Sequence, residues 1–152
     1  MTTLTLNKMA VFAKRLAALL TPKDVILLHG DLGAGKTQLA KFIIRAMTRQ
    51  DTDVPSPTFT LVQTYDSPQG EIWHFDLYRL EDADEIEATG WDEARAYGIS
   101  LVEWPDRLGP LRPKTCLDIN IEIAENDTRD IILTPHCVTW EDRLNHLQSE
   151  HH

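Results

Sequence analysis

Apolar residues recur at two different spacings along the chain, and together these spacings predict a protein of mixed helices and strands. Residues 25–28 form a continuous apolar run and residues 99–102 a nearly continuous one, as expected for strands buried on both faces of a sheet. Residues 36–47 instead carry apolar side chains at helical spacing. A buried strand, a loop and an amphipathic helix therefore follow one another in the first third of the chain.

The N-terminal segment predicts a short strand near Leu4 followed by a helix. Asn7 is placed to cap this helix, and Pro22 is placed to end it. The apolar face of the helix would consist of Met9, Phe12, Leu16 and Leu19.

The remainder of the chain predicts shorter elements separated by turns. Residues 117–123 alternate strictly between apolar and polar side chains, which predicts a strand with one buried face. Thr139 and Asp142 resemble a capping box at the start of a last helix. The other expected elements are strands at 59–65, 71–75 and 130–133, helices at 82–89 and 91–97, and a loop at 107–113.

Composition and net charge exclude several classes of protein for this chain. A chain of 152 residues, 42% of them hydrophobic, can bury one core, so we expect a single domain over residues 1–150. The formal net charge of −9 argues against a protein that holds nucleic acid by itself. The two cysteines offer neither a disulfide framework nor the cysteine spacing of a zinc site. We find no signal peptide and no apolar run near the roughly 20 residues of a membrane span, and we therefore expect a cytoplasmic protein.

The loop at residues 30–37 reads Gly-Asp-Leu-Gly-Ala-Gly-Lys-Thr and matches the phosphate-binding pattern G-x-x-x-x-G-K-[ST]. Its glycines let successive backbone N–H groups point into one concavity, which polyphosphate oxygens fill. Lys36 would reach the β- and γ-phosphates, and the Thr37 hydroxyl would bind Mg²⁺. We therefore expect ATP and Mg²⁺ as ligands. The nucleotide-binding residues predicted from this motif are Gly33, Ala34, Gly35, Lys36, Thr37 and Gln38.

A phosphate-binding loop needs a further acidic residue near Mg²⁺, usually at the end of an apolar strand. Asp76 ends the run 72–75, and Glu103 ends the run 99–102. Either acid could contact the metal or act in catalysis, and either could be a solvated residue at a strand tip. We carry both as candidate catalytic residues.

Other residues near these motifs have a structural and a functional interpretation. Thr58, in the segment Ser-Pro-Thr-Phe, could face the γ-phosphate or could belong to an ordinary turn. Trp104 could stack on a ligand or pack in the core, and His74 reads as a packed strand residue. Asn7 could line an adenine pocket if the first helix lies beside the loop. Arg129 opens a late strand and has no motif of its own.

Four motifs occur in a fixed order: the loop at 30–37, Ser-Pro-Thr-Phe at 56–59, His-Phe-Asp-Leu-Tyr-Arg-Leu at 74–80 and Val-Glu-Trp-Pro-Asp-Arg at 102–107. In this order and spacing they resemble the bacterial TsaE (also called YjeE) family, the ATPase of tRNA threonylcarbamoyladenosine biosynthesis. The first motif is shared by many families, and the other three make the resemblance specific. The resemblance spans nearly the whole chain.

The resemblance implies a small α/β domain of the P-loop NTPase type, with a mixed, mostly parallel sheet, antiparallel hairpins and flanking helices. It implies weak ATP hydrolysis that becomes useful in a complex with the TsaD and TsaB proteins. That complex would install a threonylcarbamoyl group on N6 of adenosine 37 in tRNAs reading ANN codons, and the partners would hold the tRNA. In the family, the residues matching Thr37 and Glu103 contact Mg²⁺, and those matching Asp76 and Trp104 are functionally important.

Two other functions remain open from the residues themselves. A small-molecule kinase would share the loop and would need a pocket for a phosphoryl acceptor, for which the sequence identifies no substrate. A nucleotide-sensing adaptor would bind ATP or ADP without useful hydrolysis. A GTPase is disfavoured, because no guanine-reading N/T-K-x-D sequence follows the loop.

Overall fold

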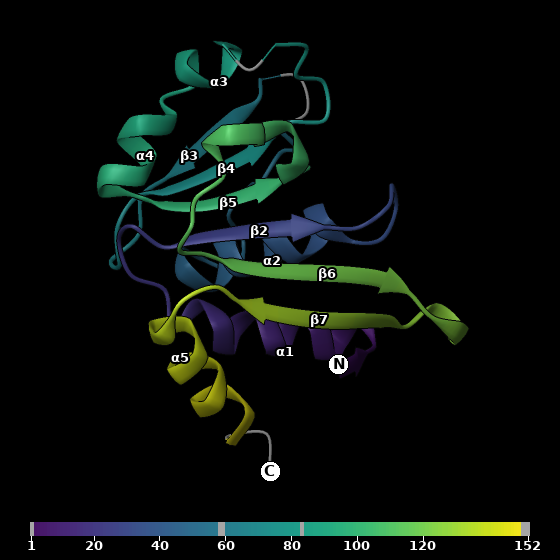
Figure 1. Cartoon of the computed structure of the whole chain (residues 1–152). Coiled ribbons are helices and arrows are strands. Elements are labelled where there is room, and N and C mark those ends of the chain that lie inside the picture. The colour runs from purple at the N-terminus through teal and green to yellow at the C-terminus, as the bar shows by residue number, and fades with distance from the viewer. Residues whose placement is uncertain (1, 58–59, 83, 150–152) are drawn as a thin grey trace.

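The computed structural model describes residues 2–57, 60–82 and 84–149, and these form one seven-stranded sheet with helices on both faces (Figure 1). The strands lie side by side in the order β1-β7-β6-β2-β5-β4-β3. Their bounds are β1 Thr2–Leu4, β2 Val25–His29, β3 Val62–Tyr65, β4 Ile72–Asp76, β5 Ile99–Glu103, β6 Leu117–Ile123 and β7 Arg129–Pro135.

The four central strands β6, β2, β5 and β4 run parallel to one another. Antiparallel pairs flank them, with β7 between β6 and β1 on one side and β3 beside β4 on the other. Five of the seven strands therefore share one direction, which confirms the expected mixed, mostly parallel sheet with antiparallel hairpins. The carboxyl ends of the parallel strands meet at one edge of the sheet, where α/β proteins commonly place their ligands.

Each face of the sheet has its own hydrophobic core, because successive strand residues point to opposite faces. Ile26 and Leu28 pack in the core beneath α1 and α2, which also holds the buried residues of α5. Leu27 and Phe75 pack in the core beneath α3 and α4. The helix bounds are α1 Leu6–Ala17, α2 Lys36–Met47, α3 Asp84–Ala88, α4 Trp91–Tyr97 and α5 Val138–Ser149, and short 3₁₀ turns span Pro105–Leu111 (η1) and Glu125–Asp127 (η2).

The expected helices at 36–47 and 91–97 are confirmed with their bounds, but the ends of the first and last helices differ from the prediction. Asn7 does not cap α1, since the helix begins at Leu6 and the Thr5 hydroxyl accepts a hydrogen bond from the Lys8 N–H at 3.3 Å. Both residue types cap helices, so the local sequence does not separate them. The helix also ends at Ala17, well before Pro22.

Four other expectations need correction. The last helix begins at Val138, which puts Thr139 inside its first turn and not at the N-cap. The expected loop at 107–113 begins inside the 3₁₀ turn η1. The strand expected at 59–65 begins at Val62, and the helix expected at 82–89 shortens to α3. Thr58 and Phe59 lie outside the described residues.

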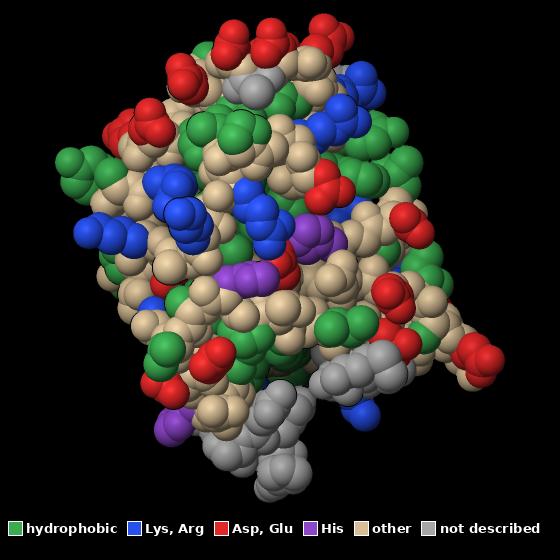
Figure 2. Space-filling model, viewed as in Figure 1, with side chains coloured by type: hydrophobic (Ala, Val, Ile, Leu, Met, Phe, Trp, Pro, Cys, Tyr) green, Lys and Arg blue, Asp and Glu red, His purple; other side chains and the backbone are tan. Residues whose placement is uncertain are grey.

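The alternation over 117–123 predicts a strand correctly but not its burial. Asp118, on the side expected to face solvent, is only 7% exposed. The reason is a cluster of polar partners brought from other elements, which is described below. Figure 2 shows acidic side chains gathered over the end of the molecule that carries α3, in keeping with the negative net charge. Among the described residues, no helix is long and apolar enough to cross a membrane.

Candidate functional site

The loop between β2 and α2 has the backbone shape that its glycines predict. Gly35 sits at the N-cap of α2 in the left-handed conformation, with φ at 114°, and no side chain caps the helix. A Cβ added to Gly30 would lie 2.7 Å from the Ile121 carbonyl oxygen, so only glycine fits there. The first N–H groups of α2 are thereby left for an anion, at the positive end of the helix dipole.

The Lys36 side chain folds back over the loop and is held there by carbonyl groups of the loop. Its side-chain nitrogen donates to the carbonyl oxygens of Gly30 and of Asp31, the latter at 3.2 Å, and lies 3.7 Å from the centroid of the Trp104 ring. Burial lowers the pKa of Lys36, although the nearby carboxylates of Glu103 and Asp76 oppose the shift. The ammonium group is thus partly desolvated and faces neutral acceptors, an arrangement in which a phosphate would be a stronger partner.

The Glu103 side chain connects α2 to the neighbouring strand β4. It ends β5, is 2% exposed, and its Oε1 accepts a hydrogen bond from the Thr37 hydroxyl at 2.5 Å. Its Oε2 lies 2.6 Å from Nε2 of the fully buried His74. Because a carboxylate only accepts, Nε2 of His74 is the donor in this contact.

Asp76 lies directly beside Glu103, since the two residues are paired in the parallel register of β4 and β5. It is 4% exposed, and its Oδ1 accepts a hydrogen bond from the Tyr78 backbone N–H at 3.0 Å. The Tyr78 ring in turn packs against the Trp104 ring with centroids 4.9 Å apart. Both predicted acids therefore reach the same edge of the sheet as the loop.

A cavity of about 450 Å³ collects most of the predicted site residues. Those that line it are Gly33, Gly35, Lys36, Thr37, Gln38, Asp76, Glu103 and Trp104, together with Asp31, Leu32, Lys41, Tyr78 and Arg79. Ala34, within the loop, is buried and lines a neighbouring cavity. Asn7 is exposed in the first turn of α1 and is not among the residues lining either cavity. Thr58, which lies outside the described residues, is not placed.

Sequence reasoning missed two residues that shape this site. The sequence predicts His74 as a packed strand residue, yet its side chain fixes one oxygen of Glu103. Arg129, the first residue of β7, donates from Nε to the Ala34 carbonyl oxygen at 2.8 Å and so supports the loop. His74 stands two residues before Asp76, so strand alternation puts both side chains on one face, but its contact with Glu103 comes from the neighbouring strand. Arg129 is 95 residues from Ala34, and no local pattern indicates that contact.

Comparison with known proteins gives one family. The profile of the family described as threonylcarbamoyl adenosine biosynthesis protein TsaE matches residues 3–131. A protein of Rickettsia bellii named tRNA threonylcarbamoyladenosine biosynthesis protein TsaE is 41% identical over 118 residues, covering 78% of this chain and 82% of that protein. A protein of the same name from Bacillus subtilis is 41% identical over 125 residues, covering 80% of this chain and 76% of that protein.

A solved structure agrees with the sequence relatives. The crystal structure of Bacillus subtilis YdiB superposes with a TM-score of 0.79 at 28% identity, and the match covers 99% of this chain and 97% of that one. The match of the family profile to most of the chain, with close relatives over more than three quarters of it, shows that the protein belongs to the TsaE family of tRNA threonylcarbamoyladenosine biosynthesis.

Proposed function

We propose that this protein binds ATP and Mg²⁺ in the cavity beside residues 30–37 and hydrolyses the ATP weakly until it joins partner proteins. The partners are the TsaD and TsaB proteins, and the complex threonylcarbamoylates N6 of adenosine 37 in tRNAs reading ANN codons. The observation that carries the ATPase part is the 2.5 Å contact between the Thr37 hydroxyl and the Glu103 carboxylate at the start of α2.

The residues of the cavity suit a magnesium nucleotide in their charge and chemistry. Mg²⁺ prefers oxygen ligands, and the Thr37 hydroxyl and Glu103 carboxylate supply two oxygens at one point. Lys36 and the N–H groups at the start of α2, which no side chain caps, supply positive charge next to them, where the polyphosphate would lie. A bound Mg²⁺ would neutralise charge developing on the transferred phosphoryl group.

Three other side chains would each have a separate role in ATP hydrolysis at this site. His74 holds Glu103 from behind, so that its other oxygen stays aimed at Thr37. Asp76 is positioned next to Glu103 and lines the cavity, which suits a group that orients the attacking water. Trp104 covers Lys36 and limits the access of water to its ammonium group.

The negative charge of the chain supports the proposed role for the partners. A protein that binds tRNA by itself gains affinity when its Lys and Arg side chains replace counterions on the phosphates. A chain with a net charge of −9 gains little affinity in this way. We therefore assign tRNA binding to TsaD and TsaB.

The test measures ATP hydrolysis by the purified protein alone and with TsaB and TsaD, together with the formation of threonylcarbamoyladenosine in a tRNA transcript supplied with an activated threonylcarbamoyl donor. We expect slow hydrolysis alone, faster hydrolysis with the partners, and modified tRNA only when all three proteins and ATP are present. ADP release that depends on a small-molecule acceptor would favour a kinase instead. Tight ATP binding with no product in a single-turnover experiment, with or without the partners, would favour an adaptor.

A further inference from the structure

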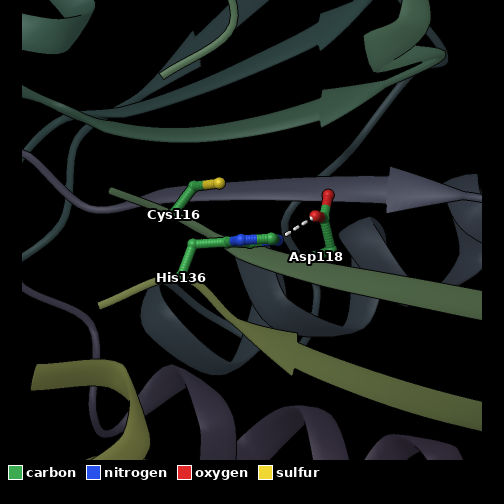
Figure 3. Close-up of side chains that lie close together, drawn as sticks. All are labelled: Cys116, Asp118 and His136. Atoms are coloured by element: carbon green, nitrogen blue, oxygen red, sulfur yellow. Dashed lines mark hydrogen bonds and ion pairs between the residues drawn. The ribbon is translucent and has the colours of Figure 1, made fainter. Parts of the chain in front are cut away.

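A second cluster of chemically distinctive side chains lies on β6 and β7, away from the nucleotide cavity. Cys116 directly precedes β6, Asp118 lies two residues later, and His136 directly follows β7 (Figure 3). The His136 backbone N–H donates to the Cys116 carbonyl oxygen at 3.0 Å, which continues the antiparallel register past Leu117 and Pro135. This register puts all three side chains on the same face of the sheet.

The donor atoms of these three residues converge. One ligand atom from each, the Cys116 sulfur, a carboxylate oxygen of Asp118 and a ring nitrogen of His136, all lie within 4.8 Å of one another. His136 Nε2 is 2.5 Å from Asp118 Oδ2, as the dashed line in Figure 3 marks. Cys116 is 1% exposed and Asp118 7%, whereas His136 is open to solvent. The cluster is therefore firmly held on one side and accessible on the other.

We propose that Cys116, Asp118 and His136 form a zinc-binding site, with a water molecule as the fourth ligand on the solvent side. Thiolate, imidazole and carboxylate are the ligand types that Zn²⁺ takes in proteins, and a set with three protein ligands leaves one position open. Cys116 releases its thiol proton on binding, so a thiolate and the Asp118 carboxylate, which also pairs with Arg112, face the ion with two negative charges.

The surroundings of the cluster fit ligands of this kind. His29 Nε2 lies 2.5 Å from Asp118 Oδ1, and the Arg112 guanidinium donates to Oδ2. The His29 contact lies on the oxygen that does not meet His136, and a contact of this kind holds a ligating carboxylate in place in metal sites. Arg112 pairs with the oxygen that also meets His136, so Zn²⁺ must displace this guanidinium to bind there. Tetrahedral zinc places its ligand atoms roughly 3.3 Å apart at bond lengths near 2.0–2.1 Å. His136 must therefore swing away from Asp118 by about 1 Å, which its exposed position at the end of β7 permits.

No sequence motif indicates this site, because its three ligands are not close together along the chain. Cys116 and Asp118 are two residues apart, but His136 is 18 residues beyond Asp118 and reaches it only through the pairing of β6 with β7. The cluster also lacks the paired cysteines of structural zinc sites.

The experiment uses Co²⁺ as a spectroscopic probe, followed by competition with Zn²⁺, on the full chain without nucleotide. We expect one Co²⁺ per chain, a thiolate-to-cobalt absorption band in the near ultraviolet, and loss of that band when Zn²⁺ is added. Cys116→Ser should abolish the band, and His136→Asn should weaken Zn²⁺ binding by at least about tenfold. Because His136 is exposed, its variant tests the site even if the buried Cys116→Ser protein folds poorly.

Matched controls separate this site from other metal ligands in the chain. Cys137→Ser changes the other cysteine, which is outside the converging set, and should keep the band. Replacing both His151 and His152 with alanine removes the terminal histidines and should also keep it. The proposal is overturned if the wild-type chain shows no thiolate band at micromolar metal, or if Cys116→Ser retains it. Equal loss in Cys137→Ser, or Zn²⁺ affinity unchanged in His136→Asn, would overturn it as well.

Discussion

Replacement of Glu103 with glutamine tests the proposed metal site most directly, because the side chain keeps its size and loses its charge. In the structure, one carboxylate oxygen accepts from the Thr37 hydroxyl at 2.5 Å and the other lies 2.6 Å from His74 Nε2. An amide has one oxygen and one nitrogen, so the glutamine oxygen can accept from His74 while Thr37 no longer donates to a carboxylate. The amide N–H can instead donate to the Thr37 hydroxyl, which also accepts, so the variant keeps its neighbours and loses the negative charge that would face Mg²⁺.

The size of the effect follows from the loss of a charged contact. Contacts of this kind contribute about 1.5–3 kcal/mol, which corresponds to roughly 10- to 100-fold in affinity. We expect the affinity for ATP in the presence of Mg²⁺ to fall by that factor. Without Mg²⁺ the phosphates still meet Lys36 and the N–H groups of α2, so the affinity should change by less than about threefold.

Titration calorimetry with ATP, once in excess Mg²⁺ and once in a chelator, measures both quantities. Glu71→Gln is the matched control, since it makes the same chemical change at an exposed residue just before β4 and should leave both affinities unchanged. If Glu103→Gln lowers the affinity equally in the two buffers, Glu103 acts on the loop and not on the metal. If it changes neither affinity, the metal site lies elsewhere.

Further substitutions test the other assignments. Lys36→Ala should weaken ATP binding by about 10- to 100-fold, or abolish turnover, through loss of a charged hydrogen bond, and normal binding together with normal turnover would contradict the proposed site. Asp76→Asn should leave MgATP affinity within about threefold and reduce partner-stimulated, single-turnover hydrolysis, because its contribution appears at the chemical step; the reverse pattern would exchange its role with that of Glu103. His74→Gln should lower Mg²⁺-dependent affinity, and its effect should be less than additive with that of Glu103→Gln in a double-mutant cycle, whereas full additivity would mean that the two residues act independently. The isolated protein should bind tRNA more weakly than micromolar at physiological salt, and submicromolar binding in a filter assay would contradict the role given to the partners.

The parts of the site that the sequence predicted are those set by local chemistry. Residues 25–47 specify a buried strand, a glycine-rich loop and an amphipathic helix, and each is found where it was expected. Asp76 and Glu103 were predicted as strand-end acids, and parallel strands end at the same edge, so their proximity follows once β4 and β5 pair. Which residue of β4 pairs with which residue of β5 could not be predicted from the sequence and is seen only in the structure.

The parts that sequence reasoning missed depend on contacts between distant segments. Arg129 supports the loop through the Ala34 carbonyl, and only the position of β7 in the sheet makes that possible. His74 carries the pattern of a buried strand residue, and its contact with Glu103 arises from the neighbouring strand. Asn7 was expected to cap a helix that Thr5 caps, because the two side chains offer similar acceptors two residues apart.

Asp118 shows why a polar residue in an alternating strand should not be assigned to solvent without knowledge of the neighbouring strands. Its pKa is subject to opposing influences: burial raises it, and hydrogen bonds from His29, Arg112 and His136 outweigh burial and lower it. These donors come from β2, from the segment after η1 and from the segment after β7. Their hydrogen bonds replace those that water would make to an exposed carboxylate. A carboxylate so fully surrounded is costly to maintain for packing alone, since an apolar residue would fill the same place without desolvation. Asp118 can stay charged there because three donors meet its two oxygens, and removing any one of them would leave part of the buried charge without a partner.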